Sequence, residues 1–87
     1  MKRRLLLDIE VIQYLEDAEP QMRAAIWQRL KQIAVSPDRF VDYHERDERG
    51  RDLAVHVFRG CAILFWDDFA DRHLKVLEIT DADDFAT

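Results

Sequence analysis

The spacing of apolar residues changes once along this chain of 87 residues, at about residue 52. Before that point apolar side chains recur every three or four positions, which is typical of a helix with one face in a core. The clearest such stripe consists of Met22, Ile26, Leu30 and Ile33. After that point apolar residues alternate, as at Leu53, Val55 and Val57, which is typical of a strand. The order predicts helices first and a sheet last.

A helical hairpin is predicted in the first half of the chain. Arg4–Leu7 can form a short opening strand or lead directly into the first helix, and Asp8 is a suitable N-cap. The first helix is expected over Ile9–Ala18. The second begins at Pro20, because proline suits a first helical turn, and it ends before Pro37. The short connection makes the two helices antiparallel neighbours.

Three strands are predicted over residues 53–58, 61–66 and 74–80. Two turns separate them, at Arg59-Gly60 and between Asp67 and His73, and residues 38–51 are expected to form a loop. The fold class is therefore α+β. A short N-terminal strand and an antiparallel helical hairpin pack on one face of an antiparallel sheet of three to four strands, in a single domain over residues 1–87.

Two helices can cover only one face of this sheet. We take Leu53, Val55 and Val57 to face the helices. The other face then carries Phe58 and part of a second apolar set, namely Ala62, Leu64, Trp66 and Val76. Large apolar side chains on an uncovered face indicate a partner or a self-interface, which we expect to include Phe58, Leu64 and Trp66. The alternative is that the C-terminal tail, Phe85 included, folds back over this face.

The charge of the chain argues against a general nucleic-acid binder. Its net charge is −5 and its pI about 5.0, so any contact with a polyanion would depend on a local basic patch. One cysteine, Cys61, excludes an internal disulfide and fits a reducing cytoplasm. The apolar run Leu5–Leu7 is too short for a signal peptide, and we expect no membrane partner.

One concentrated group of cationic residues is a candidate site. It comprises His44, Arg46, Arg49 and Arg51, which His56 and Arg59 could join. The arginines could hold a phosphate while His44 or His56 transfers a proton. Because acidic residues alternate with these cations, the alternative is a solvated loop that neutralises itself.

A second polar group, Asp67-Asp68-Phe69-Ala70-Asp71, has a spacing found among carboxylate metal ligands. Aspartates are also favoured in turns, because their side chains bond to the local backbone. We expect a turn here, with no metal and no cofactor.

The hairpin that ends in residues 29–40 (RLKQIAVSPDRF) and the segment 57–66 (VFRGCAILFW) resemble the RelE/ParE superfamily of small bacterial toxins from type II toxin–antitoxin modules. The resemblance covers nearly the whole chain. It implies the fold described above and a cognate antitoxin that wraps and neutralises the toxin. It also implies either cleavage of messenger RNA on the ribosome or, for the ParE branch, action on DNA gyrase.

The chain departs from this family at the basic positions of the ribonuclease members. Ala62 stands where an arginine usually follows the hairpin glycine, and residues 80–84 (TDADD) are acidic where a basic residue or a histidine is expected. Leu53, Val55 and Val57 replace further basic residues. A cleavage transition state gathers negative charge and needs cations in place, so these changes argue against the standard ribonuclease site.

We therefore expect a toxin-type protein that acts through protein contacts, with an antitoxin or a second copy as partner. If it does cleave RNA, the candidate arginines would bind phosphate. The alternatives are a non-toxic interaction module that keeps the toxin scaffold, and an acidic protein that occupies a cationic surface meant for nucleic acid.

Overall fold

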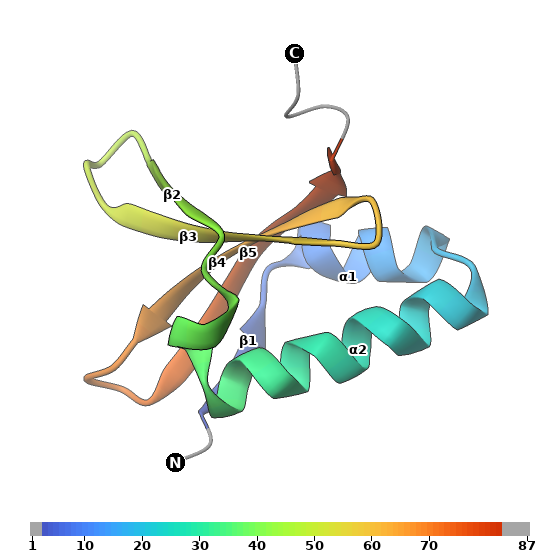
Figure 1. The fold of residues 1–87 in the computed structure, drawn as a ribbon, viewed down its shortest axis with the longest axis horizontal. Helices are drawn as coiled ribbons and strands as arrows, with labels where there is room; N and C mark the ends of the chain where they lie inside the picture. Colours follow the sequence, from blue (N-terminus) through green and yellow to red (C-terminus); the bar gives the residue numbers. More distant parts are fainter. Residues whose placement is uncertain (1–2, 83–87) are drawn as a thin grey trace.

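A computed structural model describes residues 3–82 and shows the α+β fold predicted from the sequence (Figure 1). Its elements in chain order are β1 (Arg4–Leu7), α1 (Ile9–Asp17), α2 (Pro20–Val35), the 3₁₀ helix η1 (Pro37–Phe40), β2 (Tyr43–Arg46), β3 (Asp52–Phe58), β4 (Cys61–Asp68) and β5 (His73–Asp81). Within the described residues, neither helix is both long and apolar enough to cross a membrane.

Within residues 3–82, all the strands form one sheet of five strands in the order β1-β5-β4-β3-β2. The predicted number of three to four strands was too low, and the sheet is mixed because β1 pairs parallel to β5. The opening strand is thus confirmed, and it joins the start of the chain to its last strand, with Leu5 opposite Leu74. The hairpin of α1 and α2 lies on one side of this sheet (Figure 1).

The helix boundaries follow the local signals in the sequence. The carboxylate of Asp8 accepts a hydrogen bond from the backbone N–H of Ile9, which confirms the predicted N-cap. Pro20 is the first residue of α2, and Ser36, just before Pro37, is its C-cap. α1 ends at Asp17, one residue before the predicted end.

The prediction of a loop over residues 38–51 was wrong in part. The segment contains η1 and the edge strand β2, whose four residues are all exposed. An edge strand exposed on both faces shows no alternation of apolar and polar residues, so its hydrophobic pattern is absent. The β2–β3 turn is closed by Asp47, whose Oδ1 accepts hydrogen bonds from the backbone N–H groups of Arg49 and Arg51.

Two apolar clusters lie on opposite faces of the sheet. The larger one joins Val11 of α1 and Ile26 of α2 to Ala54, Ile63 and Phe65 of the sheet. The second consists of Leu53, Val55, Ala62 and Leu64, with Trp66 and Leu77 packed against it. We call this second face the open face, because no helix in residues 3–82 covers it (Figure 1).

The predicted faces were therefore reversed for β3. The two-residue turn Arg59-Gly60 pairs Phe58 with Cys61, and the same register puts Val55 opposite Leu64. Opposed residues share a face, so Leu53, Val55 and Val57 lie with Ala62 and Leu64 and not against the helices. Phe58 and Val76 belong to the helix side. Phe85 lies outside the described residues.

Candidate functional site

The open face has a buried apolar floor and a half-exposed apolar rim. Its floor residues Leu53, Val55, Ala62 and Leu64 are each at most 8% exposed. The rim consists of Tyr43 (41% exposed), Val57 (44%) and Leu6 (42%), which the strand registers place opposite Val55, Ala62 and Lys75. A rim of half-exposed apolar side chains around a buried apolar floor is suited to contact with another protein.

Trp66 lies at the centre of the polar contacts on this face. The guanidinium of Arg51 lies 5.0 Å from the centroid of its ring, and the ammonium of Lys75 lies 4.9 Å from it. Each such cation–π contact is worth roughly 0.5–1 kcal/mol at an exposed site. Sequence reasoning named Trp66 and Arg51 separately and missed Lys75, which is the register partner of Trp66 on β5.

Arg51 and Lys75 each also form an ion pair with a carboxylate. Nε of Arg51 donates to Oδ2 of Asp47 at 2.7 Å, and Nζ of Lys75 lies 3.2 Å from Oδ2 of Asp68. Desolvation alone would raise the pKa of Asp47, but the bonds and charge of Arg51 outweigh it and the pKa is lowered. The bond from Lys75 lowers the pKa of Asp68. Both aspartates are therefore ionised near neutral pH and neutralise their cations.

The predicted phosphate-binding arginines are divided between two ends of β3. Arg46, Arg49 and Arg51 lie at the β2–β3 turn, whereas Arg59 lies in the β3–β4 turn. The seven residues of β3 separate these ends by about 23 Å, at about 3.3 Å per residue. Arg46 pairs at 3.4 Å with Asp52, and both side chains are largely exposed. The structure does not bring the four arginines together around one anion.

The two predicted catalytic histidines are also apart from each other. His44 is exposed on the edge strand β2. His56 is 8% exposed and lies on the helix side, where its ring contacts those of Phe40 and Phe58 at centroid distances of 5.3 and 6.2 Å. Arg29 of α2 lies over the same two phenylalanine rings, at 5.1 and 4.4 Å.

Both ring nitrogens of His56 have partners. Its Nδ1 lies 3.0 Å from Oδ2 of Asp42, and its Nε2 lies 3.2 Å from Nη1 of Arg29. A guanidinium can only donate, so Nε2 must accept and Nδ1 carries the proton that bonds to Asp42. Burial lowers the pKa of His56, and the charge of Arg29 adds to this effect against the opposing pull of Asp42. The neutral imidazole therefore joins α2, the segment before β2 and β3 as a structural group.

The three predicted interface residues do not share one face. Leu64 belongs to the floor of the open face, and Trp66 packs against that floor. Phe58 packs on the helix side, under Arg29 and beside Arg59, whose guanidinium lies 5.5 Å from its ring. The exposed apolar positions of the open face are instead Val57, Tyr43 and Leu6, which the sequence pattern did not single out as an interface.

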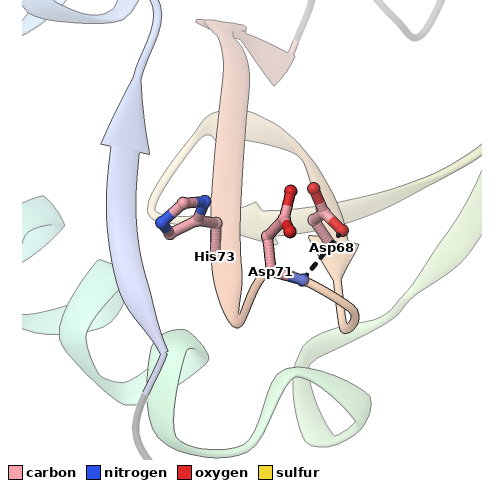
Figure 2. A group of neighbouring side chains, drawn as sticks. All are labelled: Asp68, Asp71 and His73. Atoms are coloured by element: carbon pink, nitrogen blue, oxygen red, sulfur yellow. Dashed lines mark hydrogen bonds between the residues drawn. The ribbon is translucent and has the colours of Figure 1, made fainter.

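The turn between β4 and β5 brings together Asp68, Asp71 and His73 (Figure 2). Their potential ligand atoms all lie within 4.8 Å of one another. Figure 2 shows the two carboxylates side by side and the imidazole turned toward β1. Oδ1 of Asp68 accepts a hydrogen bond of 3.4 Å from the backbone N–H of Asp71, and Oδ2 holds Lys75. We assign these aspartates to the turn, since a cation at Asp68 would compete with Lys75.

No family profile and no curated protein sequence matches this chain. Solved structures do. The RelBE2 toxin–antitoxin complex from Mycobacterium tuberculosis contains a chain that matches with a TM-score of 0.79 and 13% identity, over 93% of this chain and 99% of that one. A chain of the archaeal RelE–RelB complex from Pyrococcus horikoshii matches with a TM-score of 0.75 and 14% identity, over 93% and 96%.

A double mutant of the Escherichia coli toxin RelE in the free state matches with a TM-score of 0.73 and 13% identity, over 97% of this chain and 87% of that one. The architecture of residues 3–82, a helical hairpin on one side of a five-stranded mixed sheet, is thus that of a known class of small α+β proteins. The chain has the RelE toxin fold.

Proposed function

We propose that this protein is a RelE/ParE-like component of a bacterial toxin–antitoxin module and acts in the cytoplasm through protein contacts rather than as a ribonuclease. The observation that carries the proposal is the composition of the open face. Leu53, Val55 and Ala62, which stand where the family resemblance implies cations, form its buried apolar floor. An apolar floor cannot stabilise the charge that develops on a phosphoryl group.

The cations that do lie on this face support the same proposal. Arg51 and Lys75 are each engaged by a carboxylate and by Trp66, so they are not available as preorganised donors to a phosphate. Two of the similar structures are complexes of a toxin with its antitoxin. An antitoxin-type partner on the open face would cover the half-exposed rim of Val57, Tyr43 and Leu6.

A ribosome-dependent cleavage assay tests the absence of ribonuclease activity. We expect no cleavage of messenger RNA at concentrations at which an active RelE toxin cleaves it. Cleavage by the native protein would overturn this part of the proposal, and its loss when Arg46, Arg49, Arg51 and Arg59 are all replaced by alanine would assign phosphate binding to these arginines. Expression in a bacterial host then separates two classes of function: growth arrest without cleavage supports a toxin with another target, such as DNA gyrase, and normal growth supports a non-toxic interaction module.

The partner surface is tested with the product of the neighbouring reading frame in the genome. Val57→Asp places a charge on the rim of the open face, and we expect it to weaken the complex by roughly tenfold or more. Val35→Asp is the matched control, because Val35 is similarly exposed (52%) but lies at the end of α2. Equal affinity of the two variants would show that the partner does not bind the open face.

A further inference from the structure

Two guanidinium groups lie over one aromatic ring on the helix side of the sheet. Arg29 of α2 has its Cζ 4.4 Å from the centroid of the Phe58 ring, and Arg59 of the β3–β4 turn has its Cζ 5.5 Å from the same point. The two Cζ atoms therefore lie within about 10 Å of each other. Arg29 and Phe58 are half-buried, and Arg59 is exposed. We call these three residues the arginine cluster.

Neither guanidinium of the arginine cluster forms an ion pair within residues 3–82. Arg29 is bonded at 3.2 Å to Nε2 of the neutral His56, and its other contacts are with the rings of Phe40 and Phe58. Arg59 contacts the ring of Phe58. Carboxylates are not scarce in this chain, which has 18 Asp and Glu against 13 Lys and Arg. Two like charges beside one ring repel each other, and a bound anion would remove this repulsion.

Two acidic residues near the arginine cluster are bonded to other groups. Oδ2 of Asp42 lies 3.0 Å from Nδ1 of His56, so the imidazole ring separates this carboxylate from Arg29. Oδ1 of Asp81, on the last strand β5, accepts a hydrogen bond from the hydroxyl of Tyr14 at 3.0 Å. Neither carboxylate reaches a guanidinium of the cluster. Its positive charge is therefore left for a ligand.

Arg59 occupies a backbone position that does not favour arginine. Its φ is 50°, in the left-handed region that glycine and asparagine adopt more readily. Residues held in such conformations are concentrated at functional sites, where the side chain gives a benefit that offsets the strain. The turn gains nothing from a guanidinium, whereas the arginine cluster gains its second positive charge. This side chain is therefore better explained by binding than by the turn.

We infer that the arginine cluster binds the carboxylate of a glutamate or aspartate in a partner protein, with an apolar neighbour of that residue on the ring of Phe58. A guanidinium binds a carboxylate through two parallel hydrogen bonds, and the half-buried ring adds apolar contact area beside them. A segment with one carboxylate fits better than a nucleic acid, because the net charge of −5 repels a polyanion. The cluster and the open face lie on opposite sides of the sheet, so the inference does not depend on what binds the open face.

The test uses the full chain and peptides whose two ends are blocked and uncharged. One peptide has a single glutamate between leucines in a background of glycine and serine. A second has glutamine in place of the glutamate, and the third probe is a single-stranded RNA oligonucleotide. We expect the glutamate peptide alone to shift the NMR signals of the Nε–H groups of Arg29 and Arg59. Equal shifts with the glutamine peptide, or shifts with RNA and not with the glutamate peptide, would overturn the inference.

Arg59→Gln removes one charge of the cluster at an exposed position. We expect it to weaken binding of the glutamate peptide by roughly tenfold or more, because it removes a charge-assisted contact. Arg49→Gln is the matched control, since Arg49 is also exposed and lies in the other hairpin turn, between β2 and β3. It should leave the affinity unchanged. Equal affinity of the two variants would contradict the arginine cluster as the binding site.

A second control tests whether the chain supplies the carboxylate itself. Asp83 and Asp84 follow Ala82, whose backbone N–H bonds to the carbonyl oxygen of Gly60 at 2.8 Å, next to Arg59. In the absence of peptide, replacing both aspartates by asparagine should leave the Nε–H signals of the arginine cluster unchanged. Altered signals, together with tighter binding of the glutamate peptide, would identify the ligand as part of the same chain and overturn the assignment to a partner.

Discussion

At the scale of single residues, His56 shows how partners determine the role of a side chain. Its position beside a carboxylate would suit a proton-transfer group. The guanidinium of Arg29 on the other nitrogen and the burial of the ring argue against that role, because Nε2 already accepts a hydrogen bond from Arg29 and the residue is only 8% exposed. Residue type alone could not distinguish these outcomes, because the sequence does not show that Arg29 reaches the ring from α2.

The lowered pKa of His56 predicts a specific pH dependence of stability. The unfolded state has the ordinary pKa of 6.5, so below that pH it binds more protons than the folded state. The contribution of His56 is therefore complete above pH 6.5 and is lost as pH falls through the lower folded pKa, by at most about 1.4 kcal/mol per pH unit. In urea unfolding, the stability difference between the native protein and His56→Gln should shrink between pH 7 and pH 5.

The exposed His44 provides the control for this experiment. His44→Gln makes the same replacement at a histidine whose side chain is exposed on β2. A stability difference for His56→Gln that stays constant over the same pH range would contradict the assigned neutral imidazole.

Cys61 gives a second prediction at this scale. Its thiol is 1% exposed and donates a hydrogen bond to the carbonyl oxygen of Phe58 at 2.9 Å. Burial, with a smaller contribution from Asp81, raises the pKa of Cys61 to about 11. At pH 8 such a thiol holds about 100-fold less thiolate than one with a pKa of 9, and only the thiolate reacts. Modification by a thiol reagent should require unfolding, and fast labelling of the folded protein would contradict the burial.

At the scale of elements, the β3–β4 turn contains one residue that suits it and one that does not. Arg59 (φ 50°) and Gly60 (φ 82°) both adopt positive φ, which in a two-residue hairpin turn favours Asn-Gly. Arg59→Asn should raise the free energy of unfolding by about 0.5 kcal/mol, because asparagine tolerates this region better. Gly60→Ala should lower it by about 1 kcal/mol.

The loss in the free energy of unfolding that we expect for Gly60→Ala comes from the backbone conformation alone. A Cβ added there meets no atom within 4 Å, so no side-chain clash contributes. Urea unfolding of both variants measures the two effects, and hydrogen exchange in β3 and β4 checks that the hairpin keeps its register. A stabilised Gly60→Ala, or a destabilised Arg59→Asn, would contradict the assigned turn.

Elements with a local chemical signal could be predicted from the sequence, and those without one could not. Asp8, Pro20 and Pro37 determine helix ends through bonds and clashes within a few residues of themselves, and these boundaries were confirmed. All four residues of the strand β2 are exposed. Its sequence therefore lacks the alternation of apolar and polar residues that burial of one face produces. The contact of Lys75 with Trp66 depends on a register shift between Leu64 and Phe65, which no short sequence pattern indicates.

At the scale of the whole molecule, β1 determines how the chain closes on itself. Among the strands of residues 3–82 it alone pairs parallel, and it places residues 4–7 beside residues 73–76. The backbone N–H groups of Arg4 and Asp8 extend this pairing to the carbonyl oxygens of Arg72 and Val76, both at 3.0 Å. The sequence left open whether this segment was a strand, because a four-residue apolar run carries no period of its own. Its identity depends on a partner strand almost seventy residues away.

The alternation within β1 leads to a prediction that compares two neighbouring leucines. Leu5 is half-buried and packs against the core on the helix side, whereas Leu6 is 42% exposed on the open face. Leu5→Ala removes contacts with a core that cannot refill the space, and we expect a loss of about 2 kcal/mol in the free energy of unfolding. Leu6→Ala should cost less than about 0.5 kcal/mol. Equal losses for the two variants would mean that β1 does not hold its register against β5, and the closure of the sheet would then have to come from the helices alone.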